Sequence, residues 1–157
     1  MSVSGTIEAA CPLPDPAATE AAAAKLAALC GTGDIFCLIG DLGAGKTMFA
    51  RGFLRALGVR DDIPSPTFNL LLTYDTPRGT VWHFDLYRLS AREEAIELGI
   101  DDAFAEGICL IEWPDRLGSW LPEDRIEIHL TETESGDSRH MTLRAMGPGA
   151  ERWREPW

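Results

Sequence analysis

The stretch IFCLIGDLGAGKTMFARGF, residues 35–53, decides the fold. Residues 35–39 form a continuous apolar run, which favours a strand buried on both faces. Residues 40–47 fit the phosphate-loop pattern G-x-x-x-x-G-K-[ST]. Residues 46–57 place apolar side chains at helical spacing, and Gly58 ends the run. A buried strand, a glycine-rich loop and a helix in this order predict a P-loop NTPase-like unit.

The chemistry of phosphate binding explains each part of this loop pattern. Glycines allow backbone conformations that bring N–H groups close to a phosphate, and the following helix points its positive end at the same anion. The ammonium group of Lys46 can reach the β- and γ-phosphates, and the hydroxyl of Thr47 can bind magnesium. The pattern therefore predicts a nucleoside triphosphate, most simply ATP, with Mg²⁺. The residues expected to bind the nucleotide are Gly43, Ala44, Gly45, Lys46, Thr47 and Met48.

A P-loop site also needs an acidic residue for the metal at the end of an apolar strand. Asp85 follows the run 81–84, and Glu112 follows the run 108–111. Strand ends border the ligand crevice of α/β sheets, so at least one of the two carboxylates is expected beside the phosphates. Thr67 lies in a proline-bounded loop after the P-loop helix, where a hydroxyl can reach the metal or the γ-phosphate. A simple turn is the alternative for Thr67.

The other segments predict one α/β domain with a mixed central sheet flanked by helices. A hairpin of two strands favours antiparallel pairing, while the strand–loop–helix unit favours parallel pairing. Residues 1–146 are expected to form the P-loop domain, and residues 147–157 form a tail without a periodic pattern. The expected helices are 17–30, capped by Asp15 and Gly31, 46–57, and a short one opened by a capping box at 90–93, with a further turn at 101–105. The expected strands are 35–39, 70–74, 81–86, 108–111, 125–130 and 140–146.

Composition narrows the class of protein. The chain has 157 residues and a formal net charge of -11, so a phosphate backbone repels it and tight autonomous binding to nucleic acid is not expected. No apolar run approaches the length of a membrane span, and residues 1–15 lack the pattern of a secretory signal. The four cysteines form no C-x-x-C pair, which favours buried, reduced thiols over a zinc site. These features indicate a cytoplasmic protein.

Six motifs in order resemble the TsaE (YjeE) family of bacterial ATPases. They are residues 40–47 (GDLGAGKT), 51–53 (RGF), 65–68 (SPTF), 83–89 (HFDLYRL), 97–100 (ELGI) and 111–114 (IEWP). The resemblance covers about residues 12–130 and implies a P-loop fold. It also implies that Lys46 binds phosphate, that Thr47 and Glu112 hold magnesium, and that Asp85 and Thr67 lie at the γ-phosphate. Met48 and Phe68 stand where the family commonly has Thr and Tyr.

The family takes part in making threonylcarbamoyladenosine in tRNA, in a complex with TsaB and TsaD. The resemblance therefore implies an ATPase subunit that meets tRNA only through its partners, in keeping with the acidic charge. The alternatives are a small-molecule P-loop kinase, a GTP-dependent switch and a protein that binds nucleotide without turnover. The arginines are dispersed rather than clustered as in a kinase lid, and the guanine-reading N-K-x-D motif is absent. Arg51 is expected to face solvent or a partner, and Arg88 is the best internal candidate for a cation at the γ-phosphate.

Overall fold

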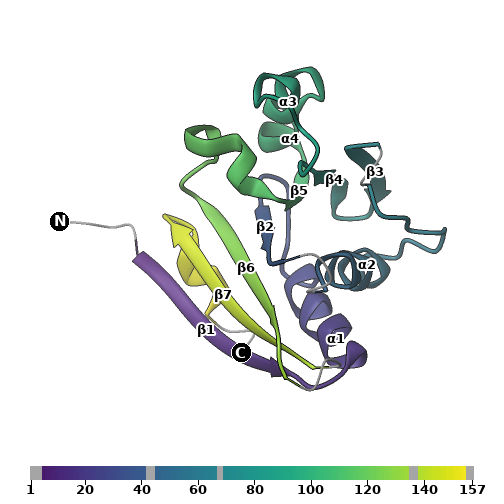
Figure 1. Ribbon diagram of the computed structural model, residues 1–157, viewed down its shortest axis with the longest axis vertical. Coiled ribbons are helices and arrows are strands. Elements are labelled where there is room, and N and C mark those ends of the chain that lie inside the picture. The colour runs from purple at the N-terminus through teal and green to yellow at the C-terminus, as the bar shows by residue number, and fades with distance from the viewer. Residues whose placement is uncertain (1–4, 42–44, 67–68, 135–137, 155–157) are drawn as a thin grey trace.

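The computed structural model of the protein describes residues 5–41, 45–66, 69–134 and 138–154. These residues form an α/β fold built on one sheet of seven strands in the order β1-β7-β6-β2-β5-β4-β3 (Figure 1). The strands are β1 Gly5–Leu13, β2 Ile35–Ile39, β3 Leu71–Thr76, β4 Gly79–Asp85, β5 Ile108–Glu112, β6 Arg125–Glu132 and β7 Arg139–Gly147. The helices are α1 Pro16–Ala27, α2 Lys46–Ala56, α3 Glu93–Glu97 and α4 Ile100–Glu106, with two 3₁₀ segments, η1 Pro114–Trp120 and η2 Ala150–Trp153.

The sheet is mixed, as the sequence predicts. Its centre is parallel, because β2 pairs in parallel with both β5 and β6, and β4 pairs in parallel with β5. Antiparallel strands close both edges: β3 forms the expected hairpin with β4, and β7 pairs with β6 on one side and β1 on the other. The P-loop NTPase-like α/β fold is therefore confirmed. The parallel centre brings the carboxyl ends of β2, β4 and β5 to one edge of the sheet.

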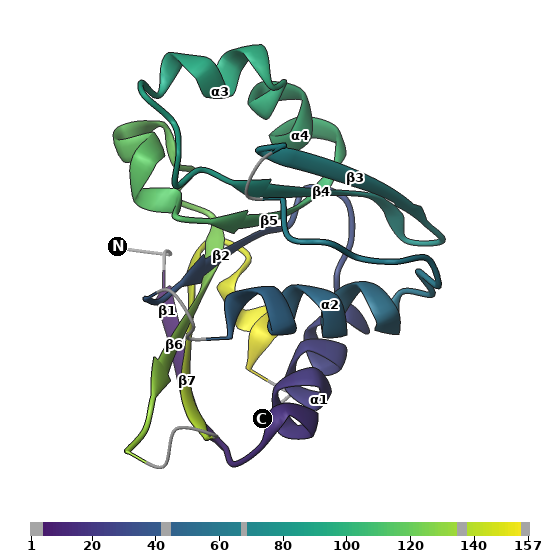
Figure 2. The same cartoon turned by 45° about the vertical axis from the view of Figure 1, so that its right-hand side comes forward.

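Helices cover both faces of the parallel centre (Figure 2). One hydrophobic cluster joins α1 and α2 to one face, and a second joins α3, α4 and η1 to the other. The two helices on the first face meet at Gly52, where a Cβ atom would lie 2.8 Å from the Cα of Glu20. Any side chain at this position would push the helices apart, which gives the glycine in the RGF motif a packing role.

Two helix boundaries differ from the sequence-based expectation. Helix α1 begins as predicted, with Asp15 accepting from the N–H of Ala18 at 2.9 Å, but it ends at Ala27 and its C-cap is Ala28 rather than Gly31. Leu29 lies beyond this helix end and is 40% exposed. Residues 28–34 instead form turns and irregular chain that lead to β2.

The predicted capping box is shifted by one residue and does not open α3 at Ser90. The N-cap is Arg92, which makes no side-chain cap bond. Instead, Oε1 of Glu94 accepts from the backbone N–H groups of Ser90 and Ala91, at 2.7 and 3.0 Å. The carboxylate of Glu94 thus accepts hydrogen bonds from the backbone N–H groups that precede the helix. Glu94 performs the role that the predicted capping box gives to Glu93.

Two chain ends acquire structure that the sequence did not indicate. Strand β1 was not predicted, yet it pairs with β7 along its whole length. After β7, the η2 turn buries Trp153 to 2% exposure, with its ring edge-on to Phe36 at 5.4 Å between centroids. Residues 147–154 therefore extend the main hydrophobic core.

Three of the four cysteines match the expectation of buried, free thiols. Cys30, Cys37 and Cys109 are buried, and Cys11 is only partly so. Burial raises the pKa of the thiol to about 11 for Cys30 and about 12 for Cys109, so both stay protonated and unreactive near neutral pH. In the part of the chain that the structure describes, no helix has the length and apolar character needed to cross a bilayer.

Candidate functional site

A cavity of about 320 Å³ opens at the carboxyl edge of the sheet. Asp85 ends β4 and Glu112 ends β5, and the two are direct partners in the parallel register. Helix α2 begins at the same edge, after Gly45 in a left-handed conformation with φ of 104°. The cavity is lined by Gly45, Lys46, Thr47, Met48, Arg51, Ser65, Asp85, Glu112, Trp113 and Arg139. The structure thus gathers every expected site residue within its described part; Gly43, Ala44 and Thr67 lie outside it.

Lys46 is a buried basic residue in the lining of the cavity. Its side chain is buried, its Nζ donates to the backbone carbonyl of Gly40 at 2.5 Å, and the ammonium lies 3.7 Å from the ring centroid of Trp113. Burial lowers the pKa of Lys46, while the negative charges of Glu112 and Asp85 act in the opposite direction. The ammonium lies in the cavity at the start of α2, where the cation and the helix N-terminus both favour an anionic ligand.

Glu112 is oriented by a buried histidine. Nε2 of His83 lies 2.7 Å from Oε2 of Glu112, and both side chains are almost fully buried. His83 precedes Asp85 by two residues on β4, so alternation along the strand places both on one face of the sheet. Sequence analysis assigned no role to His83. The alternation of residues along β4 is visible in the sequence and places His83 and Asp85 on one face of the sheet. Only the register between β4 and β5 shows that the same face carries Glu112.

The donor set of the cavity fits a magnesium ion. Thr47 supplies a hydroxyl, and the histidine contact on Oε2 leaves Oε1 of Glu112 for a ligand of the cavity. No group of three or more His, Cys, Asp and Glu side chains suited to a metal occurs among the residues that the structure describes. Mg²⁺ is commonly bound through one or two protein oxygens together with phosphate and water, so two ligands suffice.

Aromatic side chains border the same carboxylates. Trp113 adopts a left-handed backbone conformation with φ of 60°, uncommon for a large side chain, and its ring lies 4.8 Å from that of Tyr87. The backbone N–H of Tyr87 donates to Oδ1 of Asp85 at 3.1 Å. The strained turn at Trp113 places its ring over Lys46, so this tryptophan belongs to the site.

Two arginines border the cavity. Arg51 is exposed, as expected, but its Nε donates to the carbonyl of Ile63 at 2.9 Å, at the start of the proline-bounded loop. Arg139 begins β7, close to Gly45, where a Cβ atom would lie 3.8 Å from its Nε. Sequence analysis missed Arg139 because only the pairing of β7 with β6 brings it here. Arg88 is exposed and is not among the residues that line the cavity.

Known proteins share both the sequence and the fold. Residues 13–141 match the family described as "Threonylcarbamoyl adenosine biosynthesis protein TsaE". A Bacillus subtilis (strain 168) protein named "tRNA threonylcarbamoyladenosine biosynthesis protein TsaE" is 37% identical over 134 residues, 85% of this chain and 83% of its own. A protein of the same name from Rickettsia bellii (strain RML369-C) is 44% identical over 113 residues, 71% of this chain and 78% of its own.

A solved structure supports the same relationship. The fold resembles the "Crystal structure of Bacillus subtilus YdiB", with a TM-score of 0.80, 32% sequence identity, and coverage of 94% of this chain and 91% of that one. The similarity therefore covers nearly all of the chain. With these matches in sequence and structure, the chain belongs to the TsaE family.

Proposed function

We propose that the protein is the magnesium-dependent, ATP-binding and ATP-hydrolysing subunit of the cytoplasmic machinery that makes threonylcarbamoyladenosine in tRNA, acting with TsaB and TsaD. Membership of the TsaE family and the printed names of its relatives support the pathway. One structural observation supports the chemistry: Lys46, Thr47, Asp85 and Glu112 line a single cavity at the start of α2.

In this proposal each residue has a role set by its chemistry. Lys46 binds the β- and γ-phosphates, and the N–H groups at the start of α2 bind phosphate oxygens. Thr47 and Glu112 would hold Mg²⁺, which would neutralise the charge that develops on the phosphates. His83 keeps Glu112 in one orientation. Asp85, oriented by the Tyr87 N–H, positions the attacking water, and we assign Thr67 to the γ-phosphate on the strength of its loop.

The charge of the chain supports an indirect role toward tRNA. A net charge of -11 disfavours a phosphate backbone, because affinity for nucleic acid depends on neutralising phosphates with Lys and Arg. In this proposal TsaB and TsaD hold the tRNA, while this chain contributes the nucleotide cycle.

Replacing Lys46 by alanine is expected to weaken ATP binding by at least about tenfold, because a hydrogen bond to a charged group contributes roughly 1.5–3 kcal/mol. The affinity is measured by calorimetry in the presence of magnesium. Lys25→Ala is the matched control, since Lys25 is exposed on α1 and away from the cavity lining. Equal affinity for wild type and Lys46→Ala would remove the nucleotide assignment.

The proposed function is tested by single-turnover hydrolysis at fixed magnesium, with and without TsaB and TsaD. We expect slow hydrolysis by the chain alone, because phosphoryl transfer needs a positioned water and often an added cation at the γ-phosphate. The partner pair is expected to accelerate it. Fast hydrolysis by the isolated chain, unchanged by the partners, would favour a self-sufficient enzyme such as a small-molecule kinase, and binding without turnover in either condition would leave only a nucleotide-binding role.

A further inference from the structure

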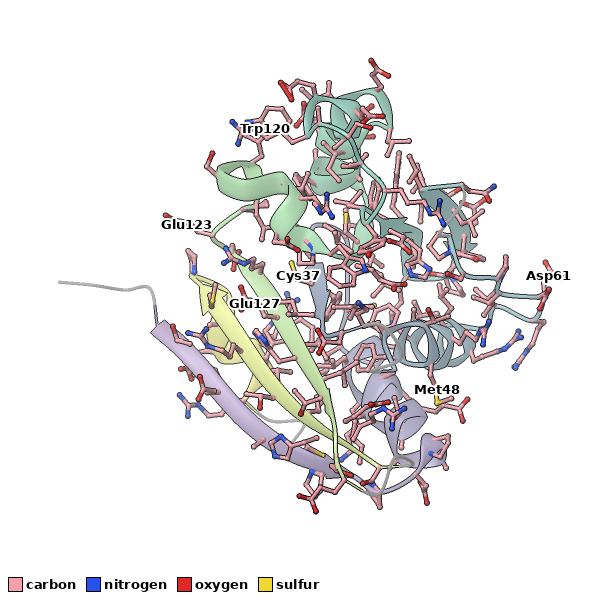
Figure 3. All side chains as sticks on the ribbon, viewed as in Figure 1. Cys37, Met48, Asp61, Trp120, Glu123 and Glu127 are labelled. Carbon is pink, nitrogen blue, oxygen red and sulfur yellow. The ribbon has the colours of Figure 1, made fainter. Side chains whose placement is uncertain are left out.

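A second cavity, of about 340 Å³, lies on the face of the sheet that α3 and α4 cover. We call it the α3–α4 groove; its lining is Ile96, Ile100, Asp101, Phe104 and Trp120. Four of these five side chains are apolar. Ile96 is 50% exposed, the highest value among the large exposed apolar side chains that the structure describes. In Figure 3 Trp120 lies on η1 beside the α3–α4 end of the molecule, apart from Met48 at the start of α2.

The two helices that border the α3–α4 groove are strongly negative. Residues 93–107 include six acidic side chains and no Lys or Arg. Five of the six are exposed: Glu93, Glu97, Asp101, Asp102 and Glu106. The nearby guanidinium of Arg92 lies 4.6 Å from the ring centroid of Trp120. A largely apolar groove is therefore bordered by two acidic helices, with the carboxylate of Asp101 in its lining and the guanidinium of Arg92 over Trp120.

The walls of the groove are held in place before any ligand arrives. Arg92 donates to the hydroxyl of Ser119 at 3.4 Å, and Arg116 donates to the carbonyl of Leu89 at 3.4 Å. These contacts tie the segment that follows β4 to η1, which follows β5. A groove whose walls are already ordered loses less conformational entropy on binding, and this favours a specific docking site over a chance hollow.

We propose that the α3–α4 groove docks a basic amphipathic helix of a partner protein. Apolar side chains on one face of such a helix would pack on Ile96, Phe104 and Trp120, in the manner of helix-in-groove recognition. Lysines or arginines beside them would meet Asp101 and the other exposed acidic side chains of α3 and α4, a complementarity of charge that also speeds encounter. The same charge repels nucleic acids and anionic membranes, and a second copy of this chain also carries a net charge of -11. The groove does not include the nucleotide cavity, so this proposal does not rest on ATP hydrolysis.

The probe is a fluorescein-labelled peptide of about 15 residues, a length at which a helix is marginally stable alone. It has leucines at helical spacing and lysines at the remaining positions, and binding to the full chain is followed by fluorescence anisotropy. Wild type is expected to bind this peptide, and a peptide with glutamate in place of lysine is expected not to bind. Ile96→Asp should weaken binding by at least about tenfold, since central apolar anchors dominate such interfaces.

Leu29→Asp is the matched control, because Leu29 is 40% exposed on the other side of the sheet, next to α1. It should bind the lysine peptide as wild type does, and a thermal melt of each variant shows that it is folded. Asp101→Lys should weaken binding by reversing the one acidic charge in the lining while keeping the apolar side chains. Equal losses in Ile96→Asp and Leu29→Asp, equal binding of the two peptides, or no binding by wild type would each overturn the proposal. So would a dimer, seen by light scattering, that Ile96→Asp dissociates.

Discussion

Replacing Trp153 with alanine is expected to lower the free energy of unfolding by about 3–5 kcal/mol, the range for removing a buried aromatic side chain. The side chain is buried, its 3₁₀ turn contacts β1 and β7 at one edge of the sheet, and its ring meets Phe36 of the central strand β2 edge-on. Alanine would leave a cavity against β2, which also leads into the phosphate loop. Urea unfolding followed by circular dichroism measures the change.

Two further variants separate packing from other contributions of the same turn. Trp153→Phe keeps an aromatic ring against Phe36 and should lose clearly less stability than alanine. Arg152→Ala removes a half-exposed ion pair with Asp34 and should change stability by about 1 kcal/mol or less. A loss below that level for Trp153→Ala would mean that residues 147–154 are a dispensable tail rather than part of the core.

The centre of the fold is predictable because its signals are local. A continuous run of five apolar residues favours a strand that is buried on both faces. A glycine-rich loop followed by apolar residues at helical spacing favours a phosphate loop that opens a helix. The observed bounds of β2 and of α2, Ile35–Ile39 and Lys46–Ala56, agree with the prediction to within one residue. The hairpin of β3 and β4 is equally local, since its turn residues lie between its strands.

The edges of the sheet are not predictable in this way. Strand β1 reads GTIEAACPL, with alanines and few β-branched residues, so nothing in its own composition favours a strand. It forms because residues more than a hundred positions later present an open edge, where Gly5 pairs with Gly147 and Leu13 with Arg139. The burial of Trp153 likewise depends on contact with residues that are distant in the sequence, such as Phe36. Long-range pairing of this kind leaves little trace in a single sequence.

The residues of the candidate site also fall into those that the local sequence predicts and those that it does not. Lys46 and Thr47 follow from the loop motif, and Asp85 and Glu112 follow from the ends of apolar runs. His83 and Arg139 reach the site only through strand register, one beside Glu112 and the other beside Gly45. The local sequence shows what chemistry each residue offers. It does not show which residue each one contacts, because that depends on the pairing of distant strands.

Replacing Glu112 with glutamine is expected to lower the rate of ATP hydrolysis by at least about 100-fold with little loss of nucleotide affinity. Glutamine keeps the shape of the side chain but removes the charge that we assign to the magnesium ligand, and even residues one step behind a metal ligand contribute 10–100-fold. Single-turnover hydrolysis with the partner pair, titrated with magnesium, gives the rate and the metal requirement together. Calorimetry gives the affinity separately.

His83→Phe provides an independent test of the same assignment. It removes the donor 2.7 Å from Oε2 while leaving both carboxylates in the cavity, so it should slow hydrolysis by about 10–100-fold and raise the magnesium needed. Asp115→Asn is the control, because this exposed carboxylate lies three residues beyond Glu112 and does not line the site cavity. If Glu112→Gln turns over normally at low magnesium while Asp85→Asn does not, Asp85 is the metal ligand. The buried histidine would then serve packing alone, because the carboxylate it orients would not touch the metal.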